Sequence, residues 1–163
     1  MVDIPINPSD LGLPFQSWRP HQAETIANIA NSAQPTTLFE SPTGSGKAAV
    51  AVGVLMATGS RGMILTHSMA LQDQYASTYS SVASIIGSGN FARDEAGGLP
   101  DEYVDMRNRG MAAQITVTNY SWFLNAANRW KIPQNLDWLI LDEAHLIEDV
   151  IGNFITVELD RSV

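Results

Sequence analysis

The segment Ser41-Pro42-Thr43-Gly44-Ser45-Gly46-Lys47-Ala48 constrains the fold most, because it joins a β-prone run to a helix-forming one. Its two closely spaced glycines allow a backbone turn that directs successive N–H groups around an anion, and the helix that follows presents its positive N-terminus there. Lys47 comes directly after the second glycine and can reach the terminal phosphates of a nucleotide. A glycine turn with a surface lysine is the alternative. We expect a phosphate-binding loop between a strand and a helix.

The last position of this loop departs from the usual pattern, in which Ser or Thr follows the lysine. Ala48 stands there and has no hydroxyl to ligate Mg²⁺. Because Mg²⁺ requires near-octahedral oxygen coordination, a water must replace the hydroxyl or the metal binds more weakly. A nucleoside triphosphate with Mg²⁺ is the expected ligand, and the loop residues expected to bind it are Pro42, Thr43, Gly44, Ser45, Gly46, Lys47 and Ala48.

A second motif, Asp142-Glu143-Ala144-His145, closes an apolar strand. Ligands dock at the carboxyl edge of a parallel sheet, so Asp142 is placed to hold Mg²⁺ through water, and Glu143 to orient and deprotonate an attacking water. With Lys47, these two acids are the predicted catalytic residues of phosphoanhydride hydrolysis. The alternative is a helix N-terminus that carries acids for its dipole.

Short apolar strands alternate with helices along the chain, which predicts an α/β fold: a mostly parallel sheet with helices on both faces. Residues 1–17 contain Pro5, Pro8 and Pro14 and are expected to form an extended leader before one domain over 18–163. A flexible insertion is expected at about 80–103 and an exposed strand at 154–159. The remaining strands are expected at 36–40, 62–66, 114–118 and 136–141, and the helices at 20–31, 47–58, 68–79, 103–111 and 120–130.

Composition excludes several classes of protein. The 163 residues contain no cysteine, which rules out disulfides, thiolate zinc sites and cysteine-held iron–sulfur clusters and favours an intracellular, cytoplasmic protein. The longest uncharged apolar run, Ala48 to Ala57, is far shorter than the ~20 residues of a membrane span, so no membrane partner is expected. The net charge of −8 means that any contact with nucleic acid must be local.

With these motifs in place, the chain resembles superfamily 2 helicases that carry an Asp-Glu-Ala-His box. Arg19-Pro20-His21-Gln22 resembles their adenine-recognising Q motif, Ser41 to Lys47 their motif I, and Asp142 to His145 their motif II. The XPD/DinG branch is the most similar one, because Leu65 to Gln74 resembles its motif Ia and Thr116 to Tyr120 the segment that precedes its motif II. The resemblance implies a RecA-like P-loop NTPase domain, the first of two such lobes.

The same branch normally carries an iron–sulfur domain. Gly87 to Arg93 resembles the motif that introduces it, but Arg93 stands where the first cysteine ligand would be, and Asp101 stands in place of another. The resemblance therefore implies a shortened remnant of this domain without a cluster.

The resemblance also assigns roles to other residues. Gln22, assisted by Arg19, would recognise adenine, and His145 would couple the nucleotide state to a second RecA-like lobe supplied in cis or in trans. Four residues would face single-stranded DNA or RNA: Thr66, His67, Asn119 and Tyr120. His67 and Tyr120 are equally compatible with interior or rim positions.

The implied function is the ATP-binding motor lobe of an ATP-dependent DNA helicase that moves 5′ to 3′. In this class the transition-state arginine comes from the second lobe, and such arginines contribute roughly 10³ to 10⁵ in rate. The isolated chain is therefore expected to be an excised or truncated lobe with weak or no activity. The alternative is a non-hydrolysing, nucleotide-gated module for nucleic-acid binding or regulation. Such a module would function without a hydroxyl at position 48, where Ala48 stands.

Overall fold

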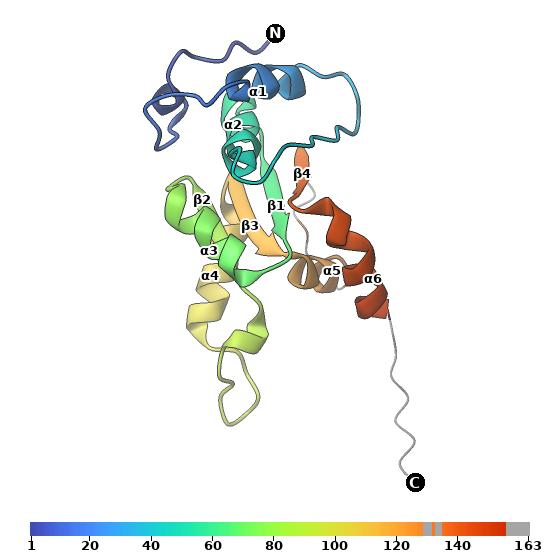
Figure 1. Cartoon of the computed structure of the whole chain (residues 1–163). Helices are drawn as coiled ribbons and strands as arrows, with labels where there is room; N and C mark the ends of the chain where they lie inside the picture. Colours follow the sequence, from blue (N-terminus) through green and yellow to red (C-terminus); the bar gives the residue numbers. More distant parts are fainter. Residues whose placement is uncertain (129–131, 133–134, 156–163) are drawn as a thin grey trace.

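A four-stranded parallel sheet forms the centre of the protein (Figure 1). The computed structural model describes residues 1–128, 132 and 135–155. Within this part of the chain the strand order is β2–β3–β1–β4, and the strands are β1 (Gly62–Thr66), β2 (Val82–Ile85), β3 (Ile115–Asn119) and β4 (Trp138–Leu141). Because the three strand pairs are all parallel, the carboxyl ends of the strands lie along one edge.

Strand β1 lies in the interior of this sheet. It pairs with β3 on one side and β4 on the other, with Gly62 opposite both Ile115 and Trp138. Each of its five residues is buried. A parallel strand covered on both faces is expected to be continuously apolar in this way.

Helices cover both faces, as the alternation of strands and helices predicts. α2 (Lys47–Thr58) and α3 (Met69–Thr78) pack on one face around Leu55, Ile64 and Val117, and α1 (Gln22–Ala30) packs against α2. α4 (Asp101–Ala112), α5 (Tyr120–Asn128) and α6 (Ile147–Ile155) lie on the other face, where Met63 and Leu65 point. No helix in the described residues is long and apolar enough to span a membrane.

The N-terminal residues pack onto the domain. They contain one 3-10 turn, η1 (Pro8–Leu11), and Leu13 is buried in the core beside α2. The indole nitrogen Nε1 of Trp18 donates a hydrogen bond of 2.9 Å to the carbonyl of Pro5. The leader therefore contributes to the hydrophobic core even though most of it is not helical.

The strand expected at 36–40 is not formed, which corrects that prediction. Phe39 packs partly buried near Ile26 and Val50, whereas Leu38 is 86% exposed. These residues pair with none of the four described strands. A β-prone composition gives a strand only where the segment pairs with a neighbouring strand, and this segment makes no such pairing in the described sheet.

The insertion expected at 80–103 and the strand expected at 154–159 also need correction. Val82–Ile85 is β2, an edge strand paired with β3, and both Val82 and Ile85 are buried. The segment then includes the short turn η2 (Ser88–Asn90) and the first turn of α4. At the other end, Phe154 and Ile155 belong to α6, and the rest of the expected strand lies outside the described residues.

Candidate functional site

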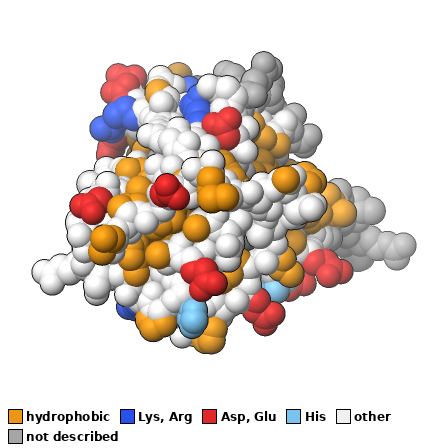
Figure 2. Space-filling model, turned by 90° about the horizontal axis from the view of Figure 1, so that it is seen from above, with side chains coloured by type: hydrophobic (Ala, Val, Ile, Leu, Met, Phe, Trp, Pro, Cys, Tyr) orange, Lys and Arg blue, Asp and Glu red, His pale blue; other side chains and the backbone are white. Residues whose placement is uncertain are grey.

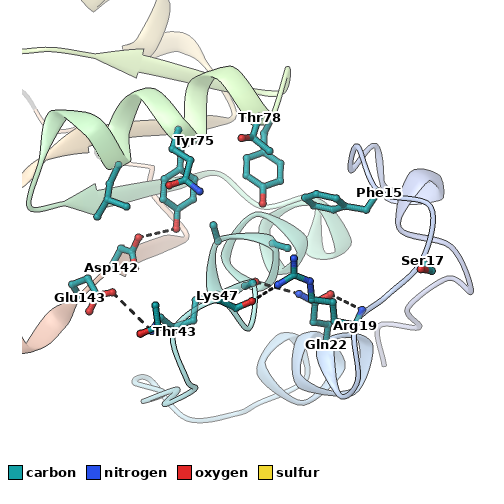
Figure 3. Close-up of a pocket in the computed structure, with 17 residues that line it drawn as sticks. Phe15, Ser17, Arg19, Gln22, Thr43, Lys47, Tyr75, Thr78, Asp142 and Glu143 are labelled. Carbon is teal, nitrogen blue, oxygen red and sulfur yellow. Dashed lines mark hydrogen bonds and ion pairs between the residues drawn. The ribbon is translucent and has the colours of Figure 1, made fainter.

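The two sequence motifs meet at the carboxyl edge of the sheet. The loop 41–46 leads into α2, and Asp142 and Glu143 follow β4 directly. The ammonium Nζ of Lys47 lies 3.8 Å from Oε1 of Glu143, and both side chains line a cavity of about 470 Å³ (Figure 3). The structure therefore brings the three predicted catalytic residues into one pocket.

The two glycines of the loop adopt a left-handed backbone conformation. Gly44 has φ 80° and Gly46 has φ 87°, values that side chains other than glycine rarely adopt. The turn is closed by a 3.2 Å hydrogen bond from the Ser45 N–H to the Pro42 carbonyl. The hydroxyl of Ser45 is buried and has no hydrogen-bond partner among the described residues, and Ser45 is not among the residues that line the pocket.

Gln22 and Arg19 hold this loop from the side of α1. The amide nitrogen of Gln22 donates to the carbonyls of Ser45 at 3.1 Å and Gly46 at 3.3 Å, while its oxygen accepts from the Arg19 N–H at 2.9 Å. The Arg19 guanidinium donates to the carbonyl of Gly44. Both residues line the pocket, and these hydrogen bonds join them to the loop and to each other. Recognition of adenine by these side chains stays a prediction.

Lys47 is the first residue of α2. Its ammonium donates a 3.1 Å hydrogen bond to the carbonyl of Ser41 at the start of the loop, and its side chain is 31% exposed. A phosphate oxygen is a stronger acceptor for this ammonium than a carbonyl, because the bond is then assisted by charge on both partners. Lys47 is thus placed to exchange the Ser41 carbonyl for a phosphate.

Asp142 is held where β4 ends. Its N–H donates to the carbonyl of Leu65 at 2.9 Å, which extends the β1–β4 pairing, and its Oδ2 accepts a 3.1 Å hydrogen bond from the Tyr75 hydroxyl. Burial raises the pKa of Asp142, the Tyr75 hydrogen bond lowers it, and the negative charge of Glu143 raises it again. Lys47 also favours the ionised form.

Glu143 and His145 continue from Asp142 into the short turn η3 (Ala144–Leu146). Glu143 adopts a left-handed backbone conformation with φ 54°, which is uncommon outside glycine. Nδ1 of His145 lies 3.4 Å from Oε2 of Glu143, and the His145 side chain is exposed. His145 therefore contacts the predicted water-activating carboxylate and borders solvent.

The sequence did not single out several aromatic residues of the pocket. Tyr75 reaches it from α3, and Tyr79 reaches it from the position directly after this helix. Phe15 reaches it from the N-terminal leader, with its ring edge-on to Tyr79 at 6.0 Å between centroids. Burial raises the pKa of Tyr79 to about 12. The four-residue spacing of the two tyrosines on a helix that follows β1 was the available signal.

Two of the four residues predicted to face nucleic acid lie in the interior, which corrects that part of the prediction. Thr66 and Tyr120 are 0% and 2% exposed. Their hydroxyls donate to the carbonyls of Ser68 at 3.1 Å and Asp142 at 2.9 Å. They are buried because they end or follow the two inner strands β1 and β3, which helices cover on both faces.

The other two residues of that set remain candidates for such a contact. His67 is exposed at the carboxyl edge of the sheet, directly after β1. Asn119 is half-buried, and its Oδ1 accepts a 2.8 Å hydrogen bond from the Trp122 N–H at the start of α5.

The pocket has the donors that Mg²⁺ with a nucleotide requires. This metal is commonly held by one or two carboxylates together with phosphate oxygens and water, and Asp142 and Glu143 supply the carboxylates. In the described residues no group of three or more His, Asp or Glu forms a metal site of its own. Ala48 lines the same pocket with only a methyl group, so water is the ligand available at its position. The residues therefore fit ATP with Mg²⁺ if water takes the place of the hydroxyl ligand at Ala48.

Two comparisons with known proteins bear on the fold and the family of the chain. The model of the DEAD/DEAH box helicase family matches residues 19–158. The crystal structure of a hypothetical ATP-dependent RNA helicase from Sulfolobus tokodaii has the same fold, with a TM-score of 0.65 and 23% sequence identity, over 90% of this chain and 44% of that one. The chain thus spans less than half of that protein's length, and no curated protein sequence matches it. Since the family model covers most of its residues, the chain belongs to the DEAD/DEAH box helicase family.

Proposed function

We propose that this domain is the ATP-binding motor lobe of an ATP-dependent helicase of the XPD/DinG-like branch. It would use Mg²⁺ and move 5′ to 3′ on single-stranded DNA. The observation that carries the proposal is that residues of the glycine loop line the same pocket as Lys47, Asp142 and Glu143. The assignment to the branch rests on the resemblance of Leu65 to Gln74, which in the structure runs from the end of β1 into α3 beside this pocket.

Each residue has a defined part in ATP hydrolysis. The loop N–H groups and Lys47 bind the phosphates, and Lys47 gives up its hydrogen bond to Ser41. Asp142 would hold Mg²⁺ through water, and the metal when bound neutralises charge that develops on the phosphates. Glu143 orients the attacking water and accepts its proton.

Completion of this site requires a second RecA-like lobe, in cis or in trans. That lobe normally supplies the arginine that stabilises the transition state. We therefore expect the chain alone to bind ATP but to hydrolyse it slowly or not at all.

Calorimetric titration with ATP and Mg²⁺ tests the proposal. The unchanged chain should bind ATP, and Lys47→Ala should remove most of the heat of binding because the phosphates lose their charged partner. Arg109→Ala is a matched control, since it removes the same charge from the exposed side of α4, outside the pocket. Equal heats from the unchanged chain and Lys47→Ala would contradict the proposal.

A second candidate function is favoured by Ala48. Without a hydroxyl ligand for Mg²⁺, the domain would act as a nucleotide-gated module that binds nucleic acid or regulates a partner without turnover. Ala48→Thr in a protein that also has the second lobe separates the two functions. The helicase proposal expects ATPase activity that nucleic acid stimulates, and Glu143→Gln should abolish it. The same background turnover in both variants would favour the module.

The nucleic-acid partner also needs a test, because the similar Sulfolobus protein is described as an RNA helicase. Among the described side chains on the face drawn in Figure 2, Lys and Arg lie at separate places and form no continuous basic patch. With a net charge of −8, we expect weak binding that falls steeply with salt. Titrating fluorescent single-stranded DNA and RNA of equal sequence should show which one binds better. A tight complex at moderate salt would contradict this charge argument.

A further inference from the structure

Two tyrosine hydroxyls hold Asp142 at two different atoms. The Tyr75 hydroxyl donates to the carboxylate Oδ2 at 3.1 Å, and the Tyr120 hydroxyl donates to the main-chain carbonyl at 2.9 Å. Both tyrosines are 2% exposed, so packing fixes their rings. Figure 3 shows the Tyr75 side chain pointing from α3 to Asp142.

The two tyrosines come from opposite faces of the sheet. Tyr75 lies on α3 and packs in the core shared with α2, whereas Tyr120 begins α5 and packs with Met63 and Leu65 on the other face. Asp142 is therefore held from both sides at the end of β4. Of the other two tyrosines, Tyr79 lines the pocket, and the hydroxyl of Tyr103 accepts a hydrogen bond from the Trp122 indole away from it.

Both hydroxyls donate in these hydrogen bonds, because the carboxylate oxygen and the main-chain carbonyl of Asp142 can only accept. A carboxylate rotates easily about its terminal torsion, which has broad minima, unless a donor fixes one of its oxygens. The carbonyl bond fixes the backbone just before the left-handed turn at Glu143.

We propose that Tyr75 and Tyr120 are positioning residues for the metal step: they orient the Asp142 carboxylate, and the backbone that carries it, toward the phosphate loop. The inference rests on the proposed function, because Asp142 would serve Mg²⁺ that is bound with a nucleotide. Neither tyrosine touches the reacting atoms. Their effect is on metal affinity and not on affinity for the nucleotide itself.

The experiment measures metal affinity separately from nucleotide affinity. Fluorescent ADP is bound to the unchanged chain, Tyr75→Phe and Tyr120→Phe in EDTA, and Mg²⁺ is then titrated. Loss of a partner that orients a metal ligand typically costs 10- to 100-fold in metal affinity. We expect the Mg²⁺ midpoint of Tyr75→Phe to rise about 10-fold or more and that of Tyr120→Phe to rise in the same direction. Affinity for ADP in EDTA should not change.

Tyr103→Phe is the matched control, since it also removes one hydroxyl from a buried tyrosine but leaves Asp142 untouched. Its Mg²⁺ midpoint should equal that of the unchanged chain. An unchanged Mg²⁺ midpoint in Tyr75→Phe would overturn the inference. An equal loss of affinity for ADP with and without Mg²⁺ would also overturn it, because it would indicate a merely structural role. An unchanged chain that binds no ADP would instead refute the proposed function, and this inference with it.

A measurement on the unchanged chain covers the case in which Tyr75→Phe does not fold. The four tyrosines, labelled with ¹³C at Cζ, are observed by NMR while Mg²⁺ is added to the ADP complex. The resonances of Tyr75 and Tyr120 should shift, and that of Tyr103 should not. No shift at Tyr75 would overturn the inference.

Discussion

Replacement of Gly46 by alanine should damage the phosphate loop in two ways. Its φ of 87° is left-handed, a conformation that costs other residues roughly 1–2 kcal/mol. The new Cβ would also overlap the side-chain amide nitrogen of Gln22. Gln22 would then have to leave the carbonyls of Ser45 and Gly46, and each hydrogen bond lost costs about 1 kcal/mol. We expect Gly46→Ala to lower the free energy of unfolding by about 3–4 kcal/mol.

Gly44→Ala separates the two effects. Gly44 has φ 80°, so alanine is similarly strained there, but no heavy atom stands within 4 Å of the added Cβ. Urea unfolding of the two variants should therefore differ by about 2 kcal/mol, the contribution of the displaced Gln22. Gly46→Ala should also bind ATP more weakly than Gly44→Ala does. Equal losses of stability in the two variants would refute the idea that Gln22 braces the loop.

Two further predictions concern the acidic motif and the edge strand. Burial raises the pKa of Asp142 above its unfolded value of 3.8, so the ligand-free fold loses stability as the pH rises through this raised pKa. Asp142→Asn should therefore melt at a higher temperature than the unchanged chain at neutral pH. This difference in melting temperature should shrink as the pH falls toward 3.8. Equal melting temperatures at neutral pH would contradict this prediction. At the edge strand, a Cβ on Gly110 of α4 would overlap the side chain of Ile85 in β2, so Gly110→Ala should cost about 1–3 kcal/mol in urea unfolding. Gly152→Ala, whose Cβ meets no heavy atom within 4 Å, should cost nothing, and equal effects would mean that β2 and α4 are not packed in this way.

The features that the sequence predicted well are those encoded over a few neighbouring residues. The helix expected at 47–58 and the strand expected at 62–66 have the observed bounds, because the helix lies between Gly46 and Gly59 and the strand is a short, mostly apolar run that begins at Gly62. The fold class is confirmed for the same reason, since the alternation of strands and helices is visible along the chain. The position of Glu143 at the carboxyl edge follows from the parallel sheet, because this residue comes just after β4, whereas the loop before Lys47 follows none of the four described strands.

The features that the sequence missed depend on contacts between distant residues. Two of the four residues of β2, Ala83 and Ser84, are small, and the segment forms a strand because β3 supplies a parallel partner. The segment 36–40 is β-prone but has no such partner among the described strands. The burial of Tyr120 and the hydrogen bond from Tyr75 to Asp142 arise from packing across the sheet, which local patterns do not encode.

The most direct test of the account is a crystal structure of the chain with Mg²⁺ and a non-hydrolysable ATP analogue. The account predicts that the triphosphate lies in the loop of residues 41–47, that Lys47 contacts its terminal phosphates, and that Asp142 holds one Mg²⁺ through water. A nucleotide bound away from this loop, or a metal ion beyond the reach of Asp142, would contradict it.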